Sequence, residues 1–271
     1  MENKMQKLIN ETIENIISSY KKEHPRIKAE YSRENELERS YKGREILELI
    51  QNAEDELTDE LPKEVYISFD GDILSIANYG EPFSEDGVIS LMYSNNSNKK
   101  NRKKKVIGNK GTGFRSILGW ADEIIINSGE LHVKFSERHA QQELKEKVFN
   151  GGSVPKDLKT ATLVFPEWID EFEEGEYTTC ISIKIKNDEN VAEDILDQLT
   201  SLNGNLLLFL NRTQKLTVDV KGKTTCFTKQ IINDDSIKLT KTVDGEEAYS
   251  KEWLLNKKEG EIGEGNQSTV S

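Results

Sequence analysis

The stretch Glu48-Leu-Ile-Gln-Asn52-Ala-Glu-Asp55 has the spacing of an amphipathic helix. We expect a helix over residues 43–59, with an apolar stripe formed by Ile46, Ile50, Ala53 and Leu57. Glu48, Asn52 and Asp55 stand on the opposite stripe, at positions i, i+4 and i+7. Periodicity alone makes this stripe a solvated helix face. Asn is unfavourable inside a helix, however, and its amide oxygen beside a carboxylate suggests a metal ligand next to a base.

A glycine-rich run, Gly108-Asn-Lys-Gly111-Thr-Gly113-Phe114, follows later in the chain. Clustered glycines let backbone N–H groups approach phosphate oxygens, so this run and the helix stripe together outline a nucleotide site. The run does not fit a P-loop, because Phe114 and Arg115 follow where lysine and serine or threonine are needed. It does not fit a dinucleotide fingerprint, because Ser116 replaces the third glycine. A flexible glycine turn before a helix is the alternative interpretation.

The composition limits the class of protein. The 271 residues include 49 acidic and 37 basic side chains, and the formal net charge of -12 argues against general adhesion to nucleic acid or anionic membranes. Cys180 and Cys226 show no CxxC spacing and indicate neither a disulfide framework nor a zinc site. The start lacks an apolar signal region, and the longest apolar run, 206–210, is too short to span a bilayer. We therefore expect a cytoplasmic protein without a membrane anchor.

Periodic patterns predict most of the remaining elements. Apolar spacing predicts helices over residues 2–22 and 191–202, and a short helix over 113–118. Asp70-Gly71-Asp72 predicts a tight hairpin between the first two strands. The β-rich runs predict strands at 65–69, 73–77, 123–127, 131–135, 160–165, 178–186, 216–220, 224–228 and 237–242.

Three segments show no such pattern. A charged passage over residues 25–40 separates the first two helices. The polar segment 84–105 ends in a lysine run at 99–105 and is typical of a mobile lid outside the core. The same run is compatible with a nucleic-acid patch, although it lacks interleaved aromatic residues. Beyond Asn256 almost no apolar residue remains, which predicts a disordered tail or a linker.

Three segments carry a family resemblance. They resemble, in this order, the ATP-binding boxes of the gyrase, heat-shock chaperone, histidine kinase and MutL (GHKL) superfamily, and most closely its sacsin-like and NO VEIN-like branch. The segments are Tyr41-Lys-Gly43-Arg-Glu-Ile-Leu-Glu48-Leu-Ile-Gln-Asn52-Ala-Glu-Asp55, Asn78-Tyr-Gly80-Glu-Pro82-Phe83 and Ile107-Gly108-Asn-Lys-Gly111-Thr-Gly113-Phe114-Arg-Ser. The motifs span residues 41–116, and the expected strand order extends the resemblance to about residue 220.

The resemblance implies a fold and a domain plan. The fold is a Bergerat-type two-layer α/β sandwich, with a mixed, mostly antiparallel sheet covered by helices on one face. Residues 1–220 form the ATP-binding domain, which includes the N-terminal helix 2–22 and a lid at 84–107. Residues 221–257 form a β-rich extension, and residues 258–271 are a disordered tail or truncated linker.

The resemblance also implies roles for the helix stripe. Glu48 matches the general base that deprotonates the water attacking the γ-phosphate. Asn52 matches the ligand of a Mg²⁺ ion, which neutralises charge on the phosphates. Asp55, one turn further on, lies near the nucleotide. The implied cofactors are therefore ATP and Mg²⁺.

The second and third boxes are matched to the base and the phosphates. Asn78 replaces the Asp that accepts a hydrogen bond from the adenine amino group, and its neutral amide oxygen can accept the same bond. Gly80 matches the glycine that lets the base lie close to the backbone, and Thr162 is a weaker match to a threonine that supports the adenine. The phosphate loop is matched by Gly108, Lys110, Gly111, Thr112, Gly113 and Phe114, and the Lys110 ammonium adds positive charge there.

Two function hypotheses follow from this resemblance. The first is a slow Mg²⁺-dependent ATPase whose lid controls a protein partner or a fused effector domain, in a chaperone-like or anti-phage defence role. A nucleotide-dependent homodimer is compatible with it. The second is a nucleotide-binding switch that does not hydrolyse ATP and acts through protein contacts, with Asn78 as the residue that favours it. A nucleic-acid module using Lys103, Lys104 and Lys105 remains a third, weaker hypothesis.

Overall fold

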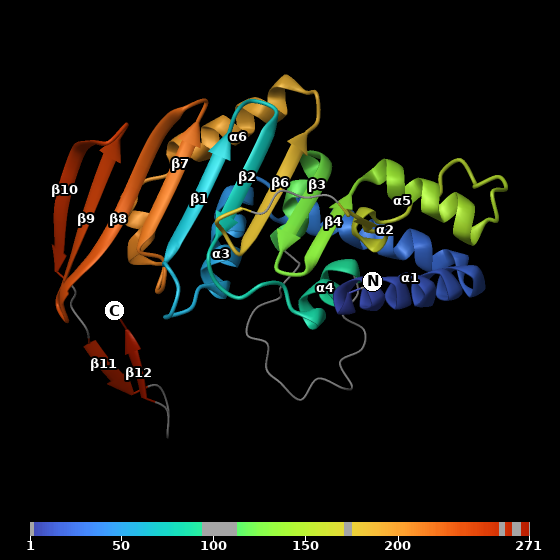
Figure 1. Cartoon of the computed structure of the whole chain (residues 1–271), viewed down its shortest axis with the longest axis horizontal. Coiled ribbons are helices and arrows are strands. Elements are labelled where there is room, and N and C mark those ends of the chain that lie inside the picture. Colours follow the sequence, from blue (N-terminus) through green and yellow to red (C-terminus); the bar gives the residue numbers. More distant parts are fainter. Residues whose placement is uncertain (1–2, 94–112, 171–174, 255–257, 262–266, 271) are drawn as a thin grey trace.

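The computed structural model describes residues 3–93, 113–170, 175–254, 258–261 and 267–270. Its centre is a ten-stranded sheet in the order β10-β9-β8-β7-β1-β2-β6-β3-β4-β5 (Figure 1). The β1–β7 pair is parallel, and the other neighbouring pairs are antiparallel. The predicted fold class, a two-layer sandwich with a mixed, mostly antiparallel sheet, is therefore confirmed.

The strands alternate between the two faces of the sheet. In β1, Val65, Ile67 and Phe69 are buried towards the helices, as the period of two requires. Asp70 accepts hydrogen bonds from the N–H groups of Asp72 and Ile73 at 2.8 and 2.7 Å, which closes the predicted β1–β2 hairpin. The strands are β1 Glu64–Phe69, β2 Ile73–Asn78, β3 Ala121–Ser128, β4 Leu131–Phe135, β5 Glu167–Trp168, β6 Thr179–Ile185, β7 Lys215–Val220, β8 Lys223–Asn233, β9 Ser236–Val243 and β10 Glu246–Leu254.

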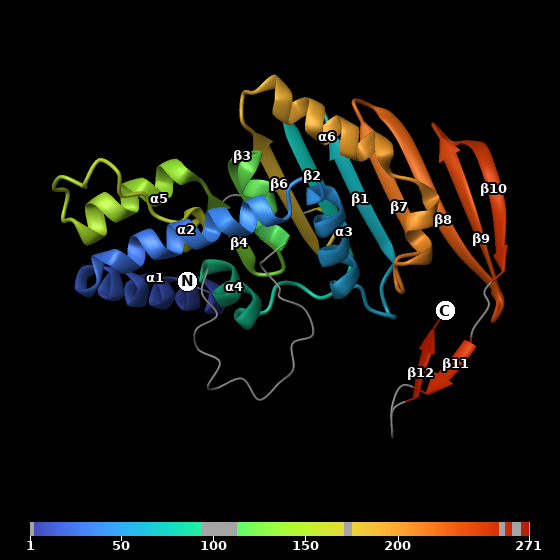
Figure 2. The same ribbon diagram turned by 180° about the vertical axis from the view of Figure 1, so that it is seen from behind.

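The helices cover one face of the sheet and its β4 end. Seen from behind, α3 and α6 lie in front of the central strands, while α1, α2 and α5 gather beside β4 (Figure 2). The α-helices are α1 Lys4–Lys22, α2 His24–Ser40, α3 Glu45–Glu56, α4 Glu85–Met92, α5 Glu137–Glu143 and α6 Glu189–Ser201. A π-helical turn, η2 Leu144–Val148, continues α5, and the 3-10 helices are η1 Gly113–Gly119, η3 Thr162–Val164 and η4 Gly204–Leu208.

Helix α3 packs through the predicted apolar stripe. Its buried apolar side chains are Ile46, Leu49, Ile50 and Ala53, followed by Leu57 just beyond its end. These side chains join one continuous core with the inward residues of β1 and β2. Burial of this stripe fixes which side of α3 faces away from the sheet, and so sets the direction of Glu48, Asn52 and Asp55.

The charged passage at 25–40 is a helix, which corrects the sequence interpretation. Pro25 stands in the first turn of α2, where a missing N–H is tolerated. Two of its four buried residues are glutamates, Glu30 and Glu34, so the apolar stripe that reveals a helix is broken. Glu30 accepts a 2.5 Å hydrogen bond from the Tyr20 hydroxyl and pairs with Arg26 at 2.7 Å. Partners inside the fold thus replace apolar contacts along this helix.

Two further segments differ from the prediction. The start of the polar segment 84–105 forms α4, whose Ser84 cap accepts from the Gly87 N–H and whose Val88, Leu91 and Met92 are buried. The rest of the proposed lid, 94–107, lies outside the described residues. The predicted strand at 160–165 contains the 3-10 helix η3 instead. Glu34 accepts the N–H groups of Thr162 and Leu163 at 2.5 and 3.3 Å, and so removes them from any β-ladder.

The C-terminal part of the chain continues the main sheet. Strands β8, β9 and β10 extend it beyond β7, so the expected boundary near residue 220 falls in the β7–β8 hairpin. Within the segment expected to be a tail, the structure has two short paired strands, β11 Lys258–Glu261 and β12 Gln267–Val270. None of the helices in the described part of the chain has the length and apolar character needed to cross a membrane.

Candidate functional site

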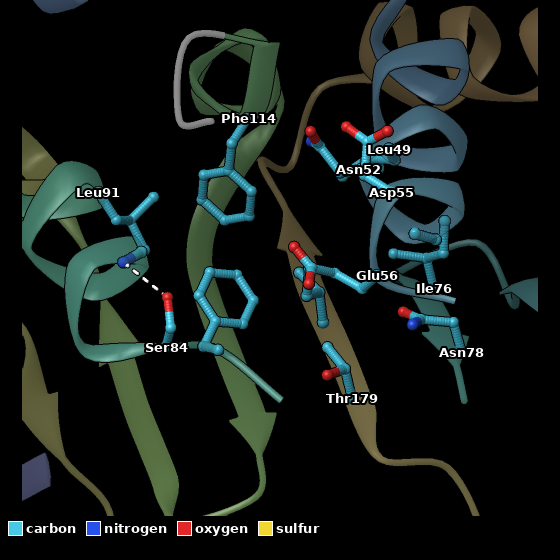
Figure 3. A pocket seen from close by; sticks show the side chains of 14 residues that line it. Leu49, Asn52, Asp55, Glu56, Ile76, Asn78, Ser84, Leu91, Phe114 and Thr179 are labelled. Carbon is cyan, nitrogen blue, oxygen red and sulfur yellow. Dashed lines mark hydrogen bonds between the residues drawn. The ribbon is translucent and has the colours of Figure 1, made fainter. Parts of the chain in front are cut away.

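A pocket lies on the helix-covered face of the sheet, between α3 and the ends of β2 and β6. The space between its walls is about 740 Å³ when the open solvent at its mouth is counted, and its lining comes from α3, β2, α4, η1, β6 and the segment before α4. Helix α3 contributes Asn52, Asp55 and Glu56, and Phe114 stands on the opposite wall (Figure 3). The pocket therefore combines polar groups on the helix with an apolar wall from η1 and α4.

Asn78 and Thr179 form the floor of the pocket. They are paired across β2 and β6, and each is only 5% exposed. The Asn78 Nδ2 donates to the Tyr79 carbonyl at 2.8 Å, which turns the amide oxygen away from that carbonyl. Figure 3 shows both side chains at the same end of the pocket, below Glu56. The floor thus offers an oriented amide acceptor beside a hydroxyl group.

A chain of hydrogen bonds fixes the Thr179 side of the floor. The hydroxyls of Thr179 and Ser128 are 2.6 Å apart, and Ser128 Oγ accepts the Phe83 N–H at 2.9 Å. The chain runs from β6 through the end of β3 to the segment that precedes α4. Because each of these residues has a partner in a neighbouring element, the hydroxyl of Thr179 is held in a defined place.

Glu48 lies one turn above Asn52 on α3, next to the first residue of η1. Its Oε1 is 3.4 Å from Nη2 of Arg44, and its side chain is 18% exposed. A Cβ at Gly113 would overlap Oε2 of Glu48, so the Glu48 carboxylate lies directly against this glycine and would have to move to admit a side chain there. The helix stripe and the last glycine of the run therefore meet in space, as a shared nucleotide site requires.

Gly80 is required by a contact with α3. Its φ of +135° lies in the region that favours glycine, and a Cβ there would overlap the carbonyl oxygen of Glu56. The next residue, Glu81, donates its N–H to that same carbonyl at 2.9 Å. This glycine brings the chain that follows Asn78 against the end of α3. Packing against α3 is therefore a reason for glycine at position 80, in addition to the role that the resemblance implies.

The opposite wall is fixed by a buried arginine. Arg115 follows Phe114, is 2% exposed and donates from Nη2 to the Leu91 carbonyl at 2.8 Å, which ties η1 to α4. Burial lowers the pKa of Arg115 and raises that of Glu34, and the attraction between the two charges opposes both shifts. Phe114 and Leu91, which line the pocket, are thereby held by the same side chain.

The structure brings some predicted site residues together and not others. Asn52, Asp55, Asn78 and Phe114 line the pocket, with Glu48 in contact with Gly113 beside it. Thr162 does not line this pocket, since it lies in η3 with its N–H bound to Glu34. Gly108, Lys110, Gly111 and Thr112 lie outside the described residues.

Thr179 is one of the pocket residues that the sequence interpretation missed, and the one on the floor beside Asn78. The feature of the sequence that could have identified it is its place at the start of the strand predicted for residues 178–186. A register that pairs this strand with β2 sets Thr179 opposite Asn78, but the order of strands in the sheet cannot be read from local periodicity.

The donor set of the pocket is compatible with Mg²⁺ bound together with phosphates. No group of three or more His, Cys, Asp or Glu side chains that could cage a metal is found among the described residues. Mg²⁺ usually keeps several waters and takes one or two protein oxygens plus substrate phosphate oxygens. The Asn52 amide oxygen on the pocket wall fits that role.

Comparison with known proteins gives little information about the function of this chain. No family profile and no curated protein matches this chain. Among solved structures, it is similar to the 43K ATPase domain of Thermus thermophilus gyrase B in complex with an aminocoumarin, with a TM-score of 0.36 and 10% identity. The similarity covers 73% of this chain and 55% of that chain, so this chain spans about half of that structure. At such a TM-score it carries no argument about function, which has to come from the pocket itself.

Proposed function

We propose that this protein binds Mg-ATP in the pocket beneath α3 and hydrolyses it slowly. One observation carries the proposal: three segments far apart in the sequence meet around one pocket, Asn52 on α3, Asn78 at the end of β2 and Phe114 after the glycine run. Gly113, at the end of the glycine run, also lies against the Glu48 carboxylate beside this pocket. The convergence therefore favours a site over a surface.

The floor of the pocket is suited to bind a nucleobase that carries an exocyclic amino group. The oriented Asn78 oxygen accepts from that amino group, and the Thr179 hydroxyl bonds a neighbouring edge atom. The apolar side chains of the pocket, Ile76, Phe83, Leu91, Phe114 and Ile181, enclose the rings. Buried polar groups of this kind discriminate strongly, because a wrong partner leaves them unpaired.

The upper part of the pocket supports phosphoryl chemistry. Asn52 would hold Mg²⁺, which supplies charge neutralisation on the phosphates when it is bound. Glu48 orients a water molecule and takes its proton through a carboxylate oxygen. Gly113 keeps the backbone close to that carboxylate, so the chain after the glycine run and the base act at the same place.

Glu48→Ala tests the assignment of the base. We expect phosphate release to fall by roughly 10²–10⁴-fold, the usual contribution of a general base, while ATP still raises the melting temperature. Gln51→Ala, an exposed change on the same helix, serves as the control and should leave turnover unchanged. Unchanged turnover in Glu48→Ala would remove Glu48 from the mechanism.

A second candidate is a nucleotide switch that binds ATP without turnover. The Arg44–Glu48 ion pair favours it, because the carboxylate assigned as base is engaged by a cation at 3.4 Å. An ATP-dependent rise in melting temperature without phosphate release from the wild-type protein would select this candidate. In either case we propose, on the sacsin-like resemblance, that the nucleotide controls a protein partner, a second copy of the chain or a fused effector domain.

A further inference from the structure

The last turn of α3 carries Asp55 and directly follows Asn52, and it is held from outside the helix. The final carbonyl groups of any helix have no partner within it, and they carry the negative end of the helix dipole. Helix α3 has no basic residue in its last turn. What holds this turn therefore also sets where the two site residues point.

Glu54 attaches this turn to the segment that leads into β7. Its carboxylate is buried, with 8% of the residue exposed. It accepts the N–H of Arg212 at 2.6 Å, the N–H of Thr213 at 2.7 Å and the hydroxyl of Thr213 at 2.5 Å. Three donors on one buried carboxylate offset its loss of hydration and fix its direction.

Arg212 completes the attachment by capping the helix. Its Nη1 donates to the carbonyls of Asp55 and Leu57, each at 3.0 Å. The guanidinium thus supplies the cation that α3 lacks in its own last turn. Because Arg212 is more than 150 residues away in sequence, no local pattern reveals this cap.

The same segment is also held from the sheet extension. Lys229 on β8 donates from its ammonium to the Leu210 carbonyl, and the N–H of Lys229 donates to the Gln214 carbonyl at 2.7 Å. Lys229 is buried, and burial lowers its pKa. The segment 210–214 is therefore fixed by α3 on one side and by β8 on the other.

We infer that Glu54 and Arg212 are positioning residues for the nucleotide site: they lock the last turn of α3, and with it Asn52 and Asp55, onto the β7–β8 end of the sheet. This inference rests on the proposed function. It connects β7 and β8 to the pocket through the segment 210–214 and the end of α3. Glu45, the other buried glutamate of α3, supplies the matched comparison, since it binds Gln198 of α6 at 2.7 Å from the first turn of the helix.

The test compares Glu54→Gln, Arg212→Ala and Glu45→Gln with the wild-type chain of 271 residues. A glutamine at position 54 has one oxygen, and its NH₂ group would face either the N–H of Arg212 or the N–H of Thr213, so it cannot reproduce the three hydrogen bonds. Arg212 is exposed, so its truncation leaves the core intact. The first readout is amide hydrogen exchange without nucleotide, and the second is ATP affinity by calorimetry with and without Mg²⁺.

We expect faster exchange over residues 50–57 and 210–214 in Glu54→Gln and Arg212→Ala, and about tenfold weaker binding of Mg-ATP. Arg212→Lys should restore part of that affinity. Glu45→Gln should keep wild-type affinity for Mg-ATP even if it melts at a lower temperature. Faster exchange with unchanged Mg-ATP affinity in Glu54→Gln, or equal weakening in Glu45→Gln, would overturn the inference.

The two readouts separate this inference from the proposed function. Failure of the wild-type protein to bind ATP would overturn the proposed function and, with it, a positioning role toward ATP. Unchanged exchange in Glu54→Gln would overturn the attachment itself, whatever the wild-type protein binds.

Discussion

At the scale of single residues, Asn78 shows how local geometry changes the meaning of a substitution. The resemblance expects an aspartate there, and an amide can in principle face a ligand with either its oxygen or its nitrogen. In the structure the nitrogen is used by the Tyr79 carbonyl, so the oxygen is the acceptor. An asparagine held in this way keeps the hydrogen-bonding character of the expected aspartate without its charge.

Asn78 is therefore expected to select adenine over guanine. Guanine carries an oxygen where adenine carries an amino group, and that oxygen would face the Asn78 oxygen. We expect the wild-type protein to bind ATP more tightly than GTP, and Asn78→Ala to weaken ATP at least about tenfold while leaving GTP nearly unchanged. Calorimetric titration of both nucleotides measures this. Equal loss for both would show that Asn78 does not read the base.

At the scale of elements, some helices are visible in the sequence and others are not. Helix α3 was predicted because its buried stripe is apolar. Helix α2 was not, because Glu30 and Glu34 occupy buried positions and accept hydrogen bonds from Tyr20 of α1 and Thr162 of η3. Glu34 also binds the N–H groups of Thr162 and Leu163 in η3, where a strand was predicted, so this contact contributes to both errors. Long-range hydrogen bonds of this kind leave no periodic signal.

Glu34 also makes the stability of the protein depend on pH. Burial raises its pKa above the ordinary 4.5, opposed by the Thr162 and Leu163 N–H groups and by Arg115. A carboxyl group whose pKa is higher in the folded than in the unfolded state stabilises the fold at pH values below its unfolded-state pKa. That stabilisation is lost as the pH rises through its folded-state pKa. We expect the free energy of unfolding of the wild-type protein, relative to Glu34→Gln, to fall as pH rises above 4.5. Urea unfolding over a pH series measures this, and a relative rise would contradict it.

At the scale of the whole molecule, strand order places the site. The hairpin β1–β2 follows from alternation and turn chemistry, whereas the fold class was implied by the family resemblance. The position of β6 beside β2, which brings Thr179 to Asn78, depends on pairing across 100 residues and could not be predicted locally. The glycine run and Glu48 were predicted to act together, and the contact of Gly113 with Glu48 is consistent with this. The phosphate-loop roles of Gly108, Lys110, Gly111 and Thr112 stay predictions.

Magnesium-dependent ATP binding by the 271-residue chain tests the central claim most directly. Titration of ATP into the wild-type protein and into Asn52→Ala, each with Mg²⁺ and with chelator, separates nucleotide binding from the metal contribution. We expect the wild-type protein to bind ATP more tightly with Mg²⁺, and Asn52→Ala to lose most of that gain. The account would be contradicted if the wild-type protein bound no ATP at millimolar concentrations, or if Asn52→Ala kept the full effect of Mg²⁺.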